Sequence, residues 1–476
     1  METLNAQTTS ADALHSATPS AAMAPPRFWT LDRMATALQD HLHDAAPFGT
    51  APIGAISTDT RALRPRDAFV ALVGENHDAH DFLDVAIAQG ASALVVSRPI
   101  PLHRFNVPIF FVRDTLVALG ALARYRRDAW GKTIVGIAGS NGKTSTKELV
   151  RAALSGAYDV HATTGNLNNR IGVPLTLLSI PDDADIAVVE IGTSLPGEVA
   201  TLRDIARPDV AVITSIGEEH LEGLGSLKGV FDEELSVSIG VPLVVTPSVQ
   251  PEVADEARRL GATVVSAGLD DGDVRASTWS IDAEGRGTIV YDGVTVTPPV
   301  RGIHNLRNTM LALAVARACG ISADVAAQAI AAMPVPAMRA AWQRVGESMI
   351  INDAYNANPG STRAALEMLA HAGGPQRVAI LGTMRELGPD ADRYHDDVAR
   401  SAVGSSFDLI AGLGDFAPAL QRVALGDARV VTAPDVDELW AALVPRLQRG
   451  ATILLKASRG VKLERILPHI TAWAGA

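Results

Sequence analysis

Residues 139–145 have the composition and order of a phosphate-binding loop. They read Gly-Ser-Asn-Gly-Lys-Thr-Ser, follow the β-rich run 133–138 and open a helical pattern. Glycine lets backbone N–H groups close around phosphate oxygens, and a helix N-terminus adds positive potential. We therefore expect Lys143, exposed until a nucleotide arrives, to reach the β- and γ-phosphates, and the Thr144 hydroxyl to ligate magnesium. Ile137 replaces the first glycine of the strict pattern, which makes the loop a variant.

Polar residues also follow the next β-rich runs of the chain. Glu190 stands at the end of the run 186–191, and His220 comes shortly after the run 210–213. A carboxylate at the C-terminal tip of a neighbouring parallel strand can ligate magnesium or position a water. His220 can serve as a metal ligand, although a single histidine is more often a structural hydrogen-bonding residue.

The elements that must position these residues indicate an α/β fold. β-rich runs alternate with helical patterns along two stretches, which is typical of parallel sheets covered by helices. The runs are 133–138, 186–191, 210–213 and 243–246, then 349–352, 377–381, 409–413 and 452–456. Nearer the N-terminus, 68–73 and 93–96 are predicted strands and 82–89 a helix. The runs 288–291 and 294–297 flank Asp292-Gly293, a strong hairpin signal.

The length of 476 residues predicts about three domains, at roughly 100 to 200 residues each. The predicted ranges are a flexible tail at 1–26, an N-terminal domain at 27–130, a central domain at 131–334 and a C-terminal domain at 335–476. The tail is rich in Ala, Ser and Thr, and prolines 334 and 336 indicate a linker before the last domain.

Composition excludes several classes of protein. Hydrophobic residues make up 47% of the chain and charged residues 20%, which excludes wholesale disorder. The formal net charge of −12 argues against a broad nucleic-acid-binding surface. With Cys319 as its single cysteine the chain can form no internal disulfide, which fits a reducing cytoplasm. We find no secretory signal and no run of about 18 apolar residues that would predict a membrane span.

Taken together, the motifs resemble those of the Mur ligases, the ATP-dependent amide-forming enzymes of peptidoglycan precursor synthesis. The resemblance covers nearly the whole chain after residue 26. The phosphate loop and the segment His304-Asn305-Leu-Arg-Asn308 are shared with the wider superfamily. The segments Thr164-Gly-Asn-Leu-Asn168-Asn and Asp353-Ala-Tyr-Asn356-Ala-Asn358 are more specific to the branch that adds D-alanyl-D-alanine, which the chain resembles most closely.

The resemblance implies three domains: an N-terminal α/β domain for the UDP-linked substrate, a central ATP-binding domain and a C-terminal Rossmann-like domain for the incoming dipeptide. ATP would phosphorylate the terminal carboxylate of UDP-N-acetylmuramoyl-tripeptide, and the amine of D-alanyl-D-alanine would attack the acyl phosphate. The implied cofactor is Mg²⁺, the partners are these small molecules, and the enzyme is expected to be a monomer. The third residue of the tripeptide, diaminopimelate or lysine, stays open.

The same resemblance implies roles for individual residues. The catalytic set is Lys143, Glu190, His220, Arg339 and Glu234, and the metal set is Thr144, Glu190 and His220. The ATP set is Gly139, Ser140, Asn141, Gly142, Lys143, Thr144, Ser145, Asn305, Asn308, Arg339 and Asp353. The set for the UDP-linked substrate is Ser57, Asp59, Arg61, Thr164 and Asn168, and the dipeptide set is Asn356 and Asn358.

The chain departs from the family pattern most clearly at Glu234. Relatives carry a carbamylated lysine that helps to hold a second magnesium, and an ungapped count from His220 puts Glu234 in its place. A glutamate is already a carboxylate, but it is shorter, so the backbone must approach the metal or a water must bridge. The alternative is an exposed acidic run on a helix at 232–234. Smaller departures are Thr383, Ala457 and Ser215, where the family more often has Asp, Gly and Asn.

Three other functions remain open from the sequence. The first is a related ligase that joins a different amino acid or dipeptide. The second is a nucleotide-binding regulator that has kept the fold and lost ligation. The third is a phosphotransferase with a phosphate-binding loop, which would leave the third domain without a role. They differ in whether turnover occurs and in whether it requires an amine.

Overall fold

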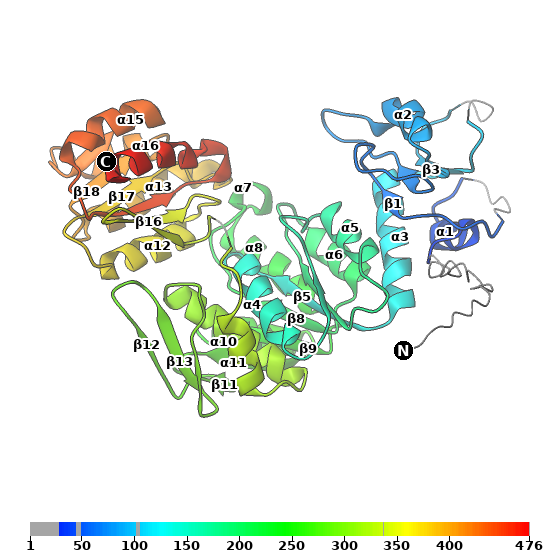
Figure 1. The fold of residues 1–476 in the computed structure, drawn as a ribbon, viewed down its shortest axis with the longest axis horizontal. Coiled ribbons are helices and arrows are strands. Elements are labelled where there is room, and N and C mark those ends of the chain that lie inside the picture. Colours follow the sequence, from blue (N-terminus) through cyan, green and yellow to red (C-terminus); the bar gives the residue numbers. More distant parts are fainter. Residues whose placement is uncertain (1–27, 44–48, 101–104, 337, 476) are drawn as a thin grey trace, which may run out of the picture. The chain divides into compact units, whose positions relative to one another are not determined.

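The computed structural model describes residues 28–43, 49–100, 105–336 and 338–475, so the predicted tail at 1–26 lies outside the described residues. The chain divides into two compact units, residues 1–113 and 114–476. Figure 1 labels many of their helices and strands, numbered in chain order.

The first unit contains a four-stranded parallel sheet in the order β1-β2-β3-β4. Its elements are α1 (Leu31–Leu38), β1 (Ile56–Ser57), β2 (Ala68–Val70), the 3₁₀ helix η1 (Ala79–Phe82), α2 (Leu83–Ala88), β3 (Ala93–Val96) and β4 (Ile109–Phe111). Strands β2 and β3 are buried along their whole length, as continuous apolar runs in a parallel sheet predict. The predicted strand 68–73 ends early because the chain turns at Leu72, whose N–H bonds to the Val70 carbonyl.

The second unit begins with α3 (Thr115–Trp130), which packs on α5 (Gly172–Leu178) and α6 (Glu198–Ala206). The Asp114 carboxylate caps this helix by accepting from two backbone N–H groups of its first turn. The sequence-based range 27–130 assigns α3 to the first domain, whereas its contacts group it with the second unit. The three predicted domain ranges otherwise stay predictions.

A fully parallel sheet of seven strands lies at the centre of this unit, in the order β11-β10-β9-β8-β5-β7-β6. Its strands are β5 (Thr133–Ala138), β6 (Val160–Ala162), β7 (Ile186–Glu190), β8 (Val210–Ile213), β9 (Leu243–Pro247), β10 (Thr263–Gly268) and β11 (Val274–Arg275). The associated helices are α4 (Lys143–Ser155), α5, α6, α7 (Leu221–Leu224), α8 (Leu227–Leu235), α9 (Pro251–Arg259), α10 (Ile303–Ala318) and α11 (Ala323–Ala331). Because β5 lies between β8 and β7, the loops that follow these three strands meet at one edge of the sheet.

A small antiparallel sheet follows, made of β12 (Thr278–Ile281), β13 (Gly287–Tyr291) and β14 (Val294–Val296). The predicted hairpin is confirmed: β13 and β14 pair across Asp292 and Gly293, and both turn residues have positive φ (51° and 75°). Positive φ at both positions is what a two-residue hairpin turn of type I′ requires.

The C-terminal part contains a six-stranded sheet in the order β15-β16-β20-β17-β18-β19. Its strands are β15 (Ala341–Val345), β16 (Ser348–Asp353), β17 (Arg377–Leu381), β18 (Leu409–Gly412), β19 (Val430–Thr432) and β20 (Thr452–Lys456). The helices are α12 (Pro359–His371), α13 (Ala391–Val403), α14 (Phe416–Val423), α15 (Val436–Leu443) and α16 (Leu467–Gly475). Only β15 runs antiparallel to its neighbour, so the predicted doubly wound parallel sheet is confirmed with an added edge strand.

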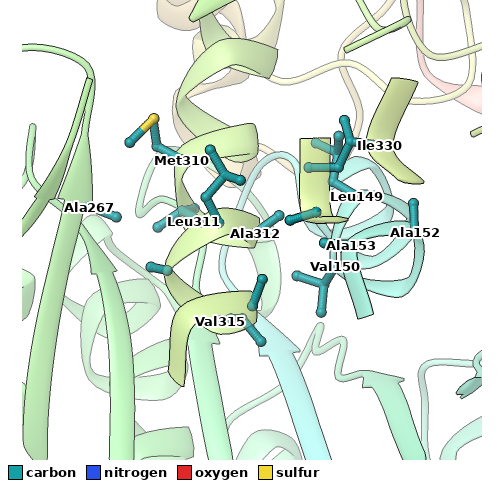
Figure 2. Packing of buried hydrophobic residues seen from close by; sticks show 14 of the residues in the cluster. Leu149, Val150, Ala152, Ala153, Ala267, Met310, Leu311, Ala312, Val315 and Ile330 are labelled. Carbon is teal, nitrogen blue, oxygen red and sulfur yellow. The ribbon is translucent and has the colours of Figure 1, made fainter. Parts of the chain in front are cut away.

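The largest apolar cluster joins α4, α10 and the central sheet. In Figure 2, Leu149 and Ala153 of α4 lie beside Leu311 and Ala312 of α10, and all four side chains are buried. Small alanine side chains at such a contact allow two helices to approach closely. The run 311–316 is fully buried, because α10 packs on α4, α11 and the sheet. This packing fixes the position of the two asparagines at the start of α10.

The α/β class predicted from the sequence is confirmed, and several predicted strands have the bounds that the sequence indicated. These are the strands at 93–96, 133–138, 210–213, 377–381 and 452–456. The linker containing prolines 334 and 336 has no regular structure in its described part. None of the helices in the described part of the chain is long and apolar enough to cross a membrane.

Candidate active site

A pocket of about 840 Å³ opens at the edge where β5, β7 and β8 end. Its lining also includes residues of the six-stranded sheet and its loops. The predicted site residues that line it are Ser140, Asn141, Gly142, Lys143, Thr144, Ser145, Asn168, Glu190, His220, Asn305, Asn308, Arg339, Asp353 and Asn356. The structure therefore brings the predicted nucleotide, metal and dipeptide residues of the second unit to one cavity, apart from Gly139 and Asn358, which do not line it.

The phosphate loop depends on its two glycines. Gly139 (φ 118°) and Gly142 (φ 86°) have a backbone conformation that L side chains rarely adopt. A Cβ on Gly139 would lie 2.4 Å from Thr214 Oγ1, and one on Gly142 would lie 2.9 Å from Asn308 Nδ2. Ser215, one of the family departures, holds the loop from the side, because its hydroxyl bonds to both the N–H and the carbonyl of Asn141 (3.2 Å each).

Lys143 is folded back onto the loop and is largely buried, so the expectation that it is exposed is wrong. Its side chain is 12% exposed, and Nζ donates to the Gly139 carbonyl (2.5 Å) and lies 3.5 Å from Glu219 Oε2. Burial acts to lower the pKa of Lys143, but the nearby carboxylates of Glu219, Glu234 and Glu190 outweigh it and raise the pKa. The lysine is therefore held as a cation before any phosphate arrives.

Thr144 and Glu190 form the best candidate for a magnesium-binding pair. The Thr144 hydroxyl donates to Glu190 Oε2, and Asn168 Nδ2 donates to Glu190 Oε1, both at 2.9 Å. Glu190 is buried, and its N–H bonds to the Thr163 hydroxyl (3.0 Å). A hydroxyl and a carboxylate in contact are oxygen donors of the kind that magnesium prefers, so these residues fit the ion.

His220 is held between two carboxylates. It has a left-handed backbone (φ 53°), its Nδ1 hydrogen-bonds to Glu386 Oε2, and its Nε2 lies 3.6 Å from Glu219 Oε1. Burial acts to lower the pKa of His220, but the bond to Glu386 and the charge of Glu219 raise it. Within the described residues, no three His, Cys, Asp or Glu side chains form a group that could hold a metal ion by themselves. A magnesium site here would need other oxygens, such as those of phosphate and water.

The six-stranded sheet contributes Asp353, at the end of β16, and the segment before β15 contributes Arg339 to the pocket. The Arg339 guanidinium stacks on the Tyr355 ring, 4.3 Å from its centroid. Asp353 Oδ2 accepts from Lys456 Nζ (2.6 Å), because β16 and β20 are neighbours and end at the same level. On α10, Asn308 Nδ2 donates to Asn305 Oδ1 (3.2 Å), and both side chains are buried.

Asn356 and Asn358 lie between β16 and α12 and connect the C-terminal part to the loops of the central sheet. Asn356 Nδ2 donates to Glu219 Oε1 (3.1 Å), and Asn358 Nδ2 donates to Asn141 Oδ1 (2.8 Å) in the phosphate loop. Asn358 also caps α12 through a reciprocal capping box with Ser361, which is the common structural use of this residue type. It does not line the pocket.

Glu234 is buried, so the alternative of an exposed acidic run is wrong. It is 1% exposed, and its Oε2 accepts from the Gly139 N–H (2.7 Å). Burial raises the pKa of Glu234 to about 7, against the opposing effects of Lys143 and of the Gly139 bond. Glu233 is buried as well, and it accepts from two backbone N–H groups at the start of α6. Glu234 does not line the pocket, so a contact with a cation there would need a water or a movement.

Of the residues expected to bind the UDP-linked substrate, Ser57, Asp59 and Arg61 lie in the first unit, and Thr164 and Asn168 lie in the second. At the end of β1, Ser57 Oγ donates to the Asp59 carbonyl (3.1 Å), and Arg61 makes a two-pronged ion pair with Asp59. The Arg61 side chain is 89% exposed. Thr164 is exposed and lies outside the lining of the pocket in the second unit.

Several charged residues of the pocket were absent from the predicted sets, among them Glu219 and Lys456. Glu219 precedes His220 in the loop after β8, and Lys456 ends β20. The signal for Glu219 was its position next to a predicted metal ligand. The signal for Lys456 was its place at the end of a predicted strand, and only the strand order places it beside Asp353.

The histidine at the start of α10 predicts a dependence of stability on pH. Burial lowers the pKa of His304 to about 4. Because the ordinary value is about 6.5, protonation favours the unfolded chain, and stability is lost as the pH falls from about 6.5 to 4. The ring keeps partial contact with solvent, so we expect the free energy of unfolding to fall by about 1–3 kcal/mol. Urea unfolding at pH 7.5 and 4.5 should show this extra loss in the wild type and not in His304→Gln. An equal acid loss in both would contradict it.

Comparison with known proteins identifies the family. The Mur ligase middle domain matches residues 137–316, which contain the phosphate loop, and the Mur ligase glutamate ligase domain matches residues 339–459. The UDP-N-acetylmuramoyl-tripeptide–D-alanyl-D-alanine ligase of Bacillus subtilis (strain 168) is 34% identical over 427 residues, which cover 88% of this chain and 93% of that protein. The chain belongs to the Mur ligase family. The ligase of the same name from Escherichia coli (strain K12) is 34% identical over 434 residues, covering 87% of this Mur ligase and 93% of that protein.

Solved structures extend the similarity to the fold. A crystal structure of MurF from Acinetobacter baumannii has a TM-score of 0.85 at 29% identity, over 93% of this Mur ligase and 99% of that chain. The MurF ligase of Thermotoga maritima in complex with ADP has a TM-score of 0.80 at 28% identity, over 88% and 97%. The three-domain α/β fold that the sequence motifs implied is thereby confirmed for this Mur ligase.

Proposed function

We propose that this Mur ligase uses ATP to join D-alanyl-D-alanine to UDP-N-acetylmuramoyl-tripeptide in peptidoglycan precursor synthesis. The observation that carries the proposal is the single pocket lined by Lys143 and Thr144 of the phosphate loop together with Arg339 and Asn356, which flank β15 and β16 of the six-stranded sheet. Relatives named for this reaction are 34% identical over nearly the whole chain, and a MurF relative has been solved with ADP.

The proposed chemistry requires positive charge in the pocket, because a carboxylate must attack a triphosphate. The terminal carboxylate of the tripeptide attacks the γ-phosphate, ADP leaves, and an acyl phosphate forms. The amine of D-alanyl-D-alanine then attacks the acyl carbon, and inorganic phosphate leaves. Lys143 acts on the β- and γ-phosphates, and Arg339, oriented by the Tyr355 ring, acts on the transferred phosphoryl group. Magnesium held by Thr144 and Glu190 would supply further positive charge.

The remaining assignments belong to the same proposal. His220 and Glu234 help to hold the magnesium ion and the phosphate loop in place. The adenine and ribose are bound by Asn305, Asn308 and Asp353, the UDP-linked substrate by Ser57, Asp59, Arg61, Thr164 and Asn168, and the dipeptide by Asn356, with Asn358 fixing the start of α12. The enzyme acts as a monomer in the cytoplasm on small-molecule substrates, with Mg²⁺ as cofactor.

Mass spectrometry of the products tests the proposal and separates it from the alternatives. The chain is incubated with ATP, Mg²⁺, UDP-N-acetylmuramoyl-tripeptide and a panel of amino acids and dipeptides. We expect the mass of the pentapeptide product only with D-alanyl-D-alanine, and phosphate release only when all three substrates are present. Product with another amine would indicate a different ligase, ATP binding without turnover a regulator, and phosphate transfer without an amine a phosphotransferase.

A further inference from the structure

Glu219 is a buried carboxylate with one oxygen that accepts no hydrogen bond. The residue is 7% exposed, and its side chain lines the phosphate pocket. Oε1 accepts from Asn356 Nδ2 (3.1 Å), which fixes the orientation of the carboxylate. Oε2 accepts no hydrogen bond and lies 3.5 Å from Lys143 Nζ. Burying a carboxylate oxygen without a hydrogen bond is costly, so this atom is prepared for a partner that arrives later.

The charge around Lys143 indicates what that partner is. Three carboxylates, those of Glu219, Glu234 and Glu190, act on one lysine ammonium. A nucleotide would bring the negative charge of its phosphates next to this group of carboxylates. Magnesium usually binds through one or two carboxylates together with substrate phosphates and several waters. A cation that enters with the nucleotide would therefore satisfy both the free oxygen and the charge.

We propose that Glu219 Oε2 is a ligand of a divalent cation that binds together with the nucleotide phosphates. Thr144 and Glu190 are the oxygen donors on the β5–β7 side of the pocket, and Glu219 adds a carboxylate from the loop after β8. The Asn356 contact makes this ligand dependent on the loop after β16, since that amide fixes Oε1. Glu234 lies beneath the loop and does not line the pocket. Glu219, next to His220, thus supplies a carboxylate to the pocket where Glu234 does not.

Nucleotide binding with and without metal tests this proposal, which rests on the proposed use of ATP. Calorimetry would measure the affinity for ADP in EDTA and with Mn²⁺, and electron paramagnetic resonance would measure Mn²⁺ binding in the ADP complex. Glu219→Gln retains the shape and the acceptor for Asn356 but removes the charge. Glu222→Gln is the matched control, because it removes one charge from the same segment at an exposed position outside the pocket.

We expect Mn²⁺ to tighten ADP binding by the wild type and by Glu222→Gln, and this gain to fall about 10-fold or more in Glu219→Gln. In EDTA, Glu219→Gln should bind ADP as well as the wild type or better, since a negative charge beside the phosphates is gone. A full metal-dependent gain in Glu219→Gln would overturn the proposal and leave Glu219 as a counter-ion of Lys143. Equal losses of affinity with and without Mn²⁺ would also overturn it, because they indicate a structural role.

Two further results keep the proposal distinct from its premise and from a folding defect. If the wild type binds no ADP in the presence of Mn²⁺, the use of ATP itself is wrong. If Glu219→Gln fails to fold, Glu219→Asp takes its place in the test, because it retains the charge on a shorter side chain. We expect Glu219→Asp to lose part of the increase in ADP affinity that Mn²⁺ produces. An undiminished increase in that variant would overturn the proposed role of Glu219 as a metal ligand.

Discussion

Lys143→Ala should reduce turnover by about 10²- to 10³-fold at saturating ATP, because loss of one electrostatic contact to a transition state typically has an effect of this size. In the structure Lys143 is the cation on which three carboxylates act, and it lies within the loop that would surround the phosphates. Its loss therefore removes the positive charge nearest to the proposed phosphoryl transfer and leaves the carboxylates unbalanced. Turnover should be measured as phosphate release under saturating concentrations of all three substrates.

The matched control is Lys228→Ala, which removes a lysine whose side chain is 80% exposed on α8. This variant should keep the wild-type rate. Because Lys143 is buried among carboxylates, its replacement is also expected to lower stability, so the assay should run well below the melting temperature of the variant. If Lys143→Ala retains half of the wild-type rate, the phosphate-loop assignment is wrong.

Glu234→Ala should slow turnover on the order of 10²-fold or more and raise the magnesium requirement. Glu234 accepts the Gly139 N–H from beneath the loop and interacts electrostatically with Lys143. Its removal would leave a buried N–H without a partner and change the charge balance of the pocket. A glutamate needs no carbon dioxide to carry its carboxylate, so added bicarbonate should not change the activity of the wild type. The measurement is the initial rate as a function of magnesium concentration.

Asp232→Ala is the control on the same helix, because Asp232 is exposed and pairs only with the neighbouring Lys228 in the described contacts. It should behave like the wild type. Glu234→Gln retains an acceptor for the Gly139 N–H, so a normal rate in this variant would assign Glu234 to the loop and not to the metal. Wild-type magnesium dependence in Glu234→Ala would contradict both roles.

The sequence by itself determined the local elements that carry the chemistry. Strand β5 and the phosphate loop could be read from an apolar run followed by glycines and Lys143-Thr144, because strand propensity and tight turns are properties of adjacent residues. The same holds for the hairpin at Asp292-Gly293, whose turn type requires these residues. The match to the Mur ligase family also followed from motifs that are contiguous in the chain.

Only the tertiary structure decided which of these residues meet, because strand order and packing join segments that are far apart in the chain. The order β8-β5-β7 brings Thr144 to Glu190, and the neighbouring strands β16 and β20 bring Lys456 to Asp353. Burial was equally undetermined, since a charged residue is expected at the surface unless a partner across the fold compensates its charge. Glu234 lies beneath the loop, where the Gly139 N–H donates to it and the charge of Lys143 acts on it, and Asn356 donates to Glu219 at the pocket.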